Sequence, residues 1–503
     1  MSIRMSGMVS GLDTESIVTE LVKAQQSKLD KIKDKQTTLD WKSDKWTEVN
    51  KQISDFYTGK LSDMRLKSSY NTKKASVTDS AVASATAESG AVKGNHVLKV
   101  ERLASAASFT SKELTASGSD VTSKTKLTDI NEFGFKTGSI KIFGHKDGKE
   151  EIRTFTIDDN TTLGDFVDSL KKAGLNANFD TTQKRLYVSS NGEGVKNNFD
   201  IQNVSGNEDF VNNVFKPDKK AATDALFSLD GVTYNTSGNE NTINGIKLNL
   251  TGTTGLLTDD KSTTVVIKND TDEVYKKIVD FVAEYNKLVE SLNNLYSADD
   301  ASDYKPLTDD QKETMTDDEI NKWNEKIQGA LLRNDSYLGD VVSALRNSFY
   351  GVHSLDSDGK ATSEYASLSL YGIHTSSDWK EKGKLYIDGD KDSSLTSGNE
   401  NLLKKALESD PDKVAEDLST IFGNLYDNLK KIANTSNDYK SSQKFYNDKE
   451  ITKQKAQYKT DYSDMEKELN ELSDRYYKQF SKMEVTLQKI QESASSFTSM
   501  TGQ

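Results

Sequence analysis

The stretch DTESIVTELVKAQQSKLDKIKDKQTTLDWKSDKWTEVNKQISDFY, from Asp13 to Tyr57, decides how this sequence folds. Asp13 can accept a hydrogen bond from a free N–H of a first helical turn, and Glu15 lies where the helix dipole is positive. Further along, every seventh residue is apolar, at Ile32, Leu39, Trp46 and Ile53. This spacing predicts one helix from Thr14 to about Tyr57, roughly 65 Å long at 1.5 Å per residue.

The end of the chain has the same spacing. Every seventh residue is apolar or aromatic, at Leu469, Tyr476, Met483, Ile490 and Phe497, with Leu472, Phe480, Leu487 and Ala494 beside them. A helix with one narrow apolar stripe is marginal alone in water. We therefore expect the two terminal helices to pair with each other, with other subunits, or both. The periodicity is equally compatible with two core helices of one globular bundle. A membrane-surface helix is disfavoured, because the polar faces mix Lys with Glu and Asp.

The section from about Tyr70 to Lys268 is rich in Ser, Thr, Gly, Asn and Asp and carries short β-branched runs. Turn sequences such as HKDGK, SSNGEG and LDGV separate these runs, which predicts small antiparallel sheets. The strand-like runs are HVLKVERL (96–103), SIKIFG (139–144), EIRTFTI (151–157), RLYVSS (185–190), FSLDGVTY (227–234), INGIKLNL (243–250) and STTVVIK (262–268). One helix is expected within this section, in TTLGDFVDSLKKAGL, between a Thr cap and Gly174.

Helical periodicity returns from Asp270. Thr308 with Gln311 and Thr316 with Glu319 have capping-box spacing, which predicts two short helices. GALLRNDSYLGDVVSALRNSF (329–349) predicts another helix, and SLSLYGI with GKLYIDGD predicts a hairpin. Asp410 followed by Pro411 predicts the start of a further helix.

The fold class predicted is α+β, an elongated multidomain protein with a stalk or bundle of long coiled-coil-like terminal helices and inserted antiparallel β-rich domains. We expect four parts. They are a terminal helical segment (1–45 with 465–503), a helical bundle with a hairpin near 366–390 (46–70 with 269–464), a β-rich domain (71–110 with 225–268), and a nested β-rich domain with one helix (111–224).

The composition of the 503 residues argues against several functions. The net charge of −13 argues against nucleic-acid binding, which needs clustered cations. The absence of Cys removes disulfides and thiolate chemistry, and the three Pro residues leave long elements uninterrupted. No run of about 18 apolar residues and no apolar signal segment occurs, so no membrane insertion is expected.

No catalytic or metal motif stands out. The four histidines, His96, His145, His353 and His374, are far apart and never at metal-ligand spacing. Asp388, Asp390 and Asp392 imitate the start of a calcium loop, but Ser393 replaces its glycine and Asn399 its last acid, so a turn is favoured. We predict no enzyme activity, cofactor or metal. Trp46 is most simply a core residue, whereas Trp41, off the heptad line, could anchor a second subunit.

Five collinear phrases carry a family resemblance. These are SGLDTESIVTELVKAQQSKLDKIK, FVAEYNKLVESLNNL, YKPLTDDQKETMTDDEINKWNEKIQGALLRNDSYL, LESDPDKVAEDLSTIFG and RYYKQFSKMEVTLQKIQESASSF. Together they resemble the FliD family of flagellar filament capping proteins, also called flagellar hook-associated protein 2. The segment TTLGDFVDSLKKAGLNANFDTTQKRLYVSS is similar to a small motif of flagellins and hook-associated proteins. The likeness spans nearly the whole chain and is weakest at 191–224.

The resemblance implies a bacterial flagellar cap, a homo-oligomeric ring of a few subunits, often five, at the distal tip of the filament. It implies that the ring holds exported flagellin while flagellin folds and inserts. It further implies secretion by the flagellar type III export apparatus, a cytosolic export chaperone on the C-terminal helix, and filament-junction hook-associated proteins as neighbours. The family has no catalytic residues to transfer.

The residues expected to contact flagellin or other subunits are Ile17, Val18, Leu21, Leu29, Ile32, Leu39, Trp46, Ile53, Leu469, Leu472, Tyr476, Phe480, Met483, Leu487, Ile490 and Phe497. We hypothesise that Gln25, Gln36 and Gln479, near seam positions, keep these contacts weak so that the cap can step. The alternative function is a surface adhesin that binds host or matrix glycans through its β domains, about residues 71–268. An enzyme would require a pocket with converging polar groups.

Overall fold

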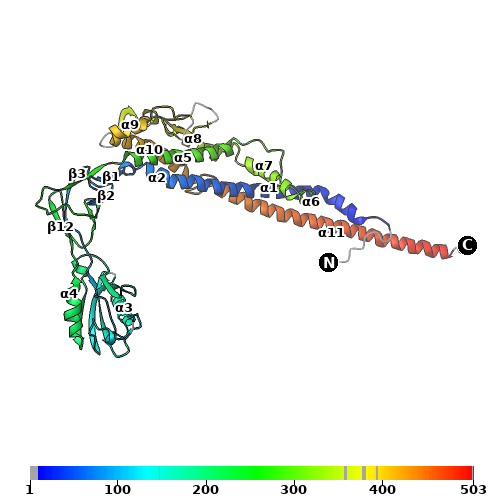
Figure 1. Cartoon of the computed structure of the whole chain (residues 1–503). Helices are drawn as coiled ribbons and strands as arrows, with labels where there is room; N and C mark the ends of the chain where they lie inside the picture. Colours follow the sequence, from blue (N-terminus) through cyan, green and yellow to red (C-terminus); the bar gives the residue numbers. More distant parts are fainter. Residues whose placement is uncertain are drawn as a thin grey trace. The chain divides into compact units, whose positions relative to one another are not determined.

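The computed structural model describes residues 10–118, 120–146, 148–355, 360–375, 381–391, 395–500 and 502. Asp392 and Ser393 of the calcium-like loop lie outside them. The described residues form two compact units: unit 1, from Met1–Tyr70 and Thr271–Gln503, and unit 2, Asn71–Asp270. Unit 1 is mostly helical and unit 2 consists mainly of antiparallel sheets (Figure 1), so the predicted α+β multidomain class is confirmed.

The first long helix of unit 1 begins where its cap predicts. Asp13 Oδ1 accepts a hydrogen bond from the backbone N–H of Ser16 at 3.0 Å, and the helix runs from Thr14 to Thr58. The predicted caps at Thr308, Thr316 and Asp410 are also formed. The helices of unit 1 are α1 (Thr14–Thr58), α2 (Lys60–Met64), α5 (Thr271–Tyr296), α6 (Asp309–Glu313), α7 (Asp317–Ala330), α8 (Ser336–Asn347), α9 (Leu402–Ser409), α10 (Pro411–Asn434) and α11 (Asp448–Met500).

The core of unit 1 lies where the second half of α1 meets α5, α8 and α10. Trp46, Tyr285 and Phe422 are fully buried there, and the rings of Phe281 and Phe422 are 4.4 Å apart. Beyond this core, α1 and α11 run side by side (Figure 1). The predicted core position of Trp46 is therefore confirmed.

One predicted helix is interrupted. The segment 329–349 contains the end of α7 and a separate helix α8, because Asn334 takes the left-handed conformation (φ 53°) between them. The carboxylate of Asp335 then accepts hydrogen bonds from the N–H groups of Tyr337 and Leu338 and starts α8. A strong N-cap inside an apolar pattern thus outweighs the continuous periodicity.

The predicted hairpin is partly wrong. SLSLY forms a short 3₁₀ turn (Leu368–Tyr371) rather than a strand, and only β18 (Ile373–Thr375) and β19 (Leu385–Ile387) pair. The Asn286 side chain of α5 holds β19 by accepting from the Leu385 N–H and donating to the Leu385 carbonyl, both at 2.7 Å. A second hairpin, β16 (His353–Leu355) with β17 (Ala361–Tyr365), was not predicted.

The described residues of unit 2 form four antiparallel sheets. Their strand orders are β1-β15-β3-β11-β12, β13-β14-β2, β10-β4-β8-β7 and β6-β5-β9. The run FSLDGVTY forms a hairpin of β11 and β12 around its LDGV turn, and INGIKLNL contains the turn after β13 and the whole of β14, because the positive φ at Asp230–Gly231 and Asn244–Gly245 makes a tight turn. The strands are β1 (Lys73–Val77), β2 (Ala83–Ala87), β3 (Gly94–Arg102), β4 (Ser108–Thr110), β5 (Gly138–Lys146), β6 (Lys149–Ile157), β7 (Leu175–Asp180), β8 (Arg185–Ser190), β9 (Asp200–Ser205), β10 (Lys219–Lys220), β11 (Ala225–Leu229), β12 (Val232–Thr236), β13 (Glu240–Ile243), β14 (Ile246–Leu250) and β15 (Thr263–Asn269).

Two hydrophobic cores lie in the described part of unit 2. The inner core is built from residues between Ala107 and Ala222, and the outer core is built from the chain before and after that segment. The chain enters and leaves the inner core side by side, since Ser105 and Thr223 exchange backbone hydrogen bonds. The inner core contains the predicted helix, α3 (Leu163–Lys172), with a complete capping box at Thr162. A short π-helix (Phe210–Phe215) and α4 (Lys216–Asp218) precede β10.

Among the described residues, no helix is both long enough and apolar enough to cross a lipid bilayer.

Candidate functional site

The candidate site is the seam between α1 and α11. Three side-chain contacts fix how the helices pair: Asn50 accepts from the Phe445 N–H at 3.0 Å, Lys455 pairs with Asp40 at 2.8 Å, and the Ser10 N–H donates to Glu484 at 3.2 Å. The residue numbers in each pair (50 with 445, 40 with 455, 10 with 484) add up to 494 or 495. A constant sum means that the helices are antiparallel and keep one register along the whole seam.

The seam is tightest where it joins the bundle core. The Trp46 ring stacks on Tyr446 with centroids 5.1 Å apart and planes 5° apart. Ile53, Phe445 and Ile451 are also buried. Trp46 Nε1 has no hydrogen-bond partner among the described residues, so its burial rests on ring packing alone.

Farther from the core the seam is looser. On α1 the buried apolar residues thin out to Leu39, Leu29 and Val18. The α11 residues that follow the seam at three- and four-residue steps are only half-buried, at Tyr458, Tyr462, Met465, Leu469, Leu472, Tyr476, Phe480, Met483 and Leu487. Each such contact removes less apolar surface from water than a core contact does, so this part of the seam is less stable than the proximal part.

The polar residues in the seam have different surroundings. The side-chain oxygen of Gln25 is buried and has no partner among the described residues. Gln36 is half-buried, whereas Gln479 is exposed. Glu484 is 9% exposed and accepts from both the backbone and the hydroxyl of Ser10, which holds the start of α1 against α11. An unpartnered buried amide oxygen costs about 1–3 kcal/mol, so Gln25 weakens the distal seam.

The sixteen residues predicted from the sequence fall into three classes of exposure. Those buried are Val18, Leu29, Leu39, Trp46 and Ile53. Those half-buried are Ile17, Ile32, Leu469, Leu472, Tyr476, Phe480, Met483 and Leu487. Those exposed are Leu21, Ile490 and Phe497. The buried residues hold unit 1 together, whereas Leu21 and Ile490 present apolar side chains at the surface.

The end of α11 is the most exposed apolar part of the seam. Ile490 is 58% and Phe497 73% exposed. The constant pairing sum places residues beyond Val485 past Ser10, so no described residue of α1 lies opposite them. Val485, five residues before Ile490, is 52% exposed, but the heptad spacing does not predict it because it falls off the heptad line.

Trp41 is half-buried and lines a cavity with Leu29, Pro306 and Leu307. Residues of the segment between α5 and α7 line this cavity, and Lys33 pairs with Asp309, which also lines it, at 2.8 Å. The hydrogen bond and the attraction of this partner raise the pKa of Lys33 and lower that of Asp309, which keeps both groups charged.

The histidines lie apart, as their positions in the sequence imply. His96 contacts Asp230, His353 Nδ1 lies 2.9 Å from the carbonyl oxygen of Thr362, and His374 lies 3.7 Å from Asp388. Asp388 also accepts a hydrogen bond from Asn399 at 2.6 Å. Among the described residues, no three carboxylate or imidazole groups converge as ligands of a metal ion would.

Two family models match this chain, one on each side of residues 108–221. The family "Flagellar hook-associated protein 2 C-terminus" matches residues 222–492, and "Flagellar hook-associated protein 2 N-terminus" matches residues 10–107. The first match alone covers more than half of the chain.

Curated relatives are similar over most of their length. The flagellar hook-associated protein 2 of Halalkalibacterium halodurans is 29% identical over 445 residues, 82% of this chain and 78% of that protein. The A-type flagellar hook-associated protein 2 of Pseudomonas aeruginosa is 27% identical over 421 residues, 78% of this chain and 77% of that protein.

A solved structure has a similar fold. The crystal structure of the D1-D2-D3 domains of the flagellar cap protein FliD from Escherichia coli superposes with a TM-score of 0.50 at 21% identity, over 76% of this chain and 95% of that one. Two family matches in chain order, relatives matched over most of their length and a shared fold lead to one conclusion: the chain belongs to the flagellar hook-associated protein 2 family.

Proposed function

We propose that this protein caps the bacterial flagellar filament at its distal tip. It acts there as a homo-oligomeric ring that holds exported flagellin and promotes its folding and insertion. The role is structural and involves no catalysis. Membership of the hook-associated protein 2 family supports the flagellar role, and the Escherichia coli protein with a similar fold is a flagellar cap protein.

The observation that carries the proposal is the exposed apolar end of α11. Val485 and Ile490 are more than half exposed in the single chain, and apolar side chains exposed together on one helix end mark a surface that binds another protein. Flagellin and a second copy of this chain are the proposed occupants in the filament. Before export by the flagellar type III apparatus, a cytosolic chaperone would cover the same surface. Filament-junction hook-associated proteins are the other expected neighbours.

Two point substitutions test this function. Ile490→Glu with Phe497→Glu places charges on the exposed end of α11 without touching the core of unit 1, so the helical content should not change. We expect flagellin in the medium as unpolymerised protein and few or short filaments, measured by immunoblotting and electron microscopy. Deleting residues 1–40 with 465–503 should give the same defect more severely.

Leu370→Glu is the matched control, because Leu370 is 61% exposed in unit 1 but lies far along the chain from the seam. It should leave filament growth unchanged. Normal filaments in the Ile490→Glu/Phe497→Glu strain would contradict the cap function.

A second candidate function, glycan-binding adhesin, is favoured by one face of unit 2. Tyr187 on β8 is 40% exposed and is paired in register with Thr110 on β4 and Asn178 on β7. These side chains and Lys171 line a hollow of about 480 Å³. An exposed ring among amides and hydroxyls can stack on a sugar and hydrogen-bond to it. This candidate requires glycan-array binding that Tyr187→Ala removes.

A further inference from the structure

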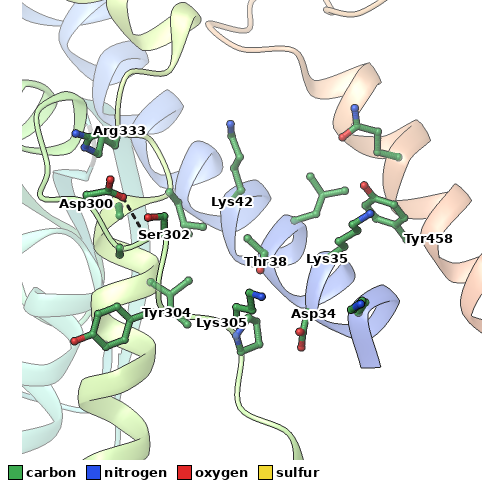
Figure 2. A pocket seen from close by; sticks show the side chains of 18 residues that line it. Asp34, Lys35, Thr38, Lys42, Asp300, Ser302, Tyr304, Lys305, Arg333 and Tyr458 are labelled. Carbon is green, nitrogen blue, oxygen red and sulfur yellow. Dashed lines mark hydrogen bonds between the residues drawn. The ribbon is translucent and has the colours of Figure 1, made fainter. Parts of the chain in front are cut away.

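A second cavity in unit 1, separate from the exposed end of α11, has a composition that suits a particular kind of partner. It has a volume of about 810 Å³ and lies between α1, the segment 300–306, the end of α7 and α11. Figure 2 shows Lys35 and Lys42 on α1, Lys305 and Arg333 on the facing wall, and Tyr458 on α11. We call this cavity the basic groove.

The rim of the basic groove is positively charged in an acidic protein. Five cationic side chains line it, against two carboxylates, which leaves a local surplus of three positive charges where the whole chain has −13. The cations are Lys31, Lys35, Lys42, Lys305 and Arg333.

The two carboxylates neutralise this charge incompletely. Asp300 accepts from the Ser302 N–H at 2.9 Å in its own turn, and this hydrogen bond, with the attraction of Arg333, lowers its pKa. Asp34 is partly buried, and burial together with the nearby charge of Asp30 raises its pKa despite the attraction of Lys305 and Lys33. Among the described residues, only one lining cation reaches ion-pair distance, since Lys42 pairs with Asp335 at 2.8 Å.

The remaining cations are available. Among the described residues, Lys31 and Lys35 form no ion pair and no hydrogen bond, and Lys305 forms no ion pair. The Arg333 guanidinium donates to the carbonyl of Ala298 at 2.9 Å and stays largely exposed. Several unpaired cations on one concave surface attract an anionic group more strongly than scattered surface lysines do.

The floor of the basic groove is apolar. Leu39 and Ile327 are buried beneath it, and Pro306, Leu331 and Tyr458 are half-buried along it. A simple anion such as phosphate would leave this floor and most of the 810 Å³ unused. A ligand that fits both parts carries carboxylates at its edges and aliphatic side chains at its centre.

We propose that the basic groove docks an acidic peptide segment of another protein, with aliphatic side chains on the floor and carboxylates against Lys31, Lys35 and Lys305. The positive rim complements such a segment, and the fixed wall of α1 presents its lysines one turn apart. The site is independent of the exposed end of α11 and of the cap function.

The test uses the full-length protein and a labelled peptide, EELLEELLEELL, followed by fluorescence anisotropy. The chain as a whole repels this anionic probe, so saturable binding that weakens as salt is added requires a local basic site. We expect the Lys31→Gln/Lys35→Gln variant to bind about tenfold more weakly, as the loss of two partly exposed ion pairs predicts. The peptides QQLLQQLLQQLL and EEAAEEAAEEAA should each bind more weakly than the original, because each lacks one of the two matching features.

The matched control is Lys23→Gln/Lys51→Gln, which removes two lysines of α1 that do not line the groove. It should leave the affinity unchanged, and circular dichroism should show equal helicity in both variants. Absence of saturable binding, or equal binding by the groove variant and the control, would overturn the proposal. So would a change of oligomeric state in Lys31→Gln/Lys35→Gln without peptide binding, which would make a second copy of this chain the occupant.

Discussion

Two buried charged residues, a lysine and an aspartate, hold segments of unit 1 together. Nothing in the sequence distinguishes them from other lysines and aspartates. The Lys440 ammonium group, 3% exposed, donates to the carbonyls of Ile432, Ala433 and Thr435 and so satisfies the end of α10. Burial lowers the pKa of Lys440, and these carbonyls compensate for the lost water. Asp417, 2% exposed, accepts from Ser354 and Tyr371 and fastens the hairpin segment to α10.

His96 forms a pH-sensitive contact in unit 2. Its Nδ1 lies 2.7 Å from Asp230 and its Nε2 lies 2.9 Å from the carbonyl oxygen of Val92, so only the doubly protonated ring can donate at both positions. Burial alone would lower the pKa of His96, but these hydrogen bonds and the charge of Asp230 outweigh it, and the net shift is upward. The same contact lowers the pKa of Asp230, against the effect of burial.

The sign of the pH dependence follows from these shifts. A raised histidine pKa contributes stability that is full below about pH 6.5, its unfolded value, and is lost as pH rises through the folded value. A lowered aspartate pKa contributes stability above about pH 3.9 that is lost as pH falls. We therefore expect unit 2 to lose up to about 1 kcal/mol from pH 6 to pH 8, and His96→Gln to remove that loss. Calorimetry of the full chain measures it.

His353→Gln is the control, because this exposed histidine belongs to unit 1 and should leave the unit 2 transition unchanged. An equal pH dependence of stability in the wild type and the His96→Gln variant would show that the His96–Asp230 pair does not contribute to it.

At the scale of elements, α1 and α11 divide into a proximal part fixed by the bundle core and a distal part held by half-buried side chains. The proximal part contains Trp46 stacked on Tyr446, whereas the distal part contains the unpartnered oxygen of Gln25. Both parts share one register, because polar contacts at each end prevent the helices from sliding. The distal seam can therefore loosen without the bundle unfolding.

Gln25→Leu with Gln36→Leu tests whether this weakness matters. Removing an unsatisfied buried oxygen and adding apolar contact should stabilise the distal seam by about 1–3 kcal/mol. If a weak seam allows the cap to step, the filament growth rate should fall, as measured by labelling filaments in successive colours.

Gln26→Leu is the matched control, since Gln26 is exposed on α1 and its one hydrogen bond to a described residue goes to Asp30 of the same helix, at 2.9 Å. It should change neither the seam nor the growth rate. Unchanged growth in the double variant, despite a stabilised seam, would rule out the stepping hypothesis.

At the scale of the whole molecule, unit 2 is inserted in the sequence between the two segments of unit 1. The two ends of unit 2 lie next to each other. The first and last strands of unit 2 pair directly, Lys73 opposite Asn269, and the Thr72 hydroxyl donates to the carbonyl of Asp270 at 3.1 Å. Each unit also has its own hydrophobic cores. Neither unit therefore needs the other to bury its apolar side chains.

We expect residues 71–270 to fold when expressed alone, and unit 1 to fold when a short Gly-Ser linker replaces them. Each product should show a cooperative thermal transition matching one of the transitions of the full chain, because the closing strand pair keeps the ends of unit 2 together. Calorimetry and amide dispersion in NMR spectra provide the measurement. A molten unit 2 would mean that its cores depend on unit 1.

Local features of the sequence predicted the long helices, the longest strands of unit 2 and the apolar stripes of α1 and α11. Capping residues such as Asp13, Thr162 and Asp410 act within one helical turn, and heptads mark a helix face whatever lies opposite. The missed hairpin and the split helix at Asn334 show the limit of this reasoning, because short strands and left-handed residues depend on their neighbours in space.

Only the tertiary structure decided which seam residues are buried and which are available. Leu21 has the apolar character of a seam residue, yet it is 46% exposed because the seam follows Val18, Val22 and Gln25 around the helix. The basic groove likewise brings together α1, α7 and α11, whose residues are hundreds of positions apart. Periodicity fixes the direction of a side chain from its own helix. What it meets there depends on packing between distant segments, which no local pattern encodes.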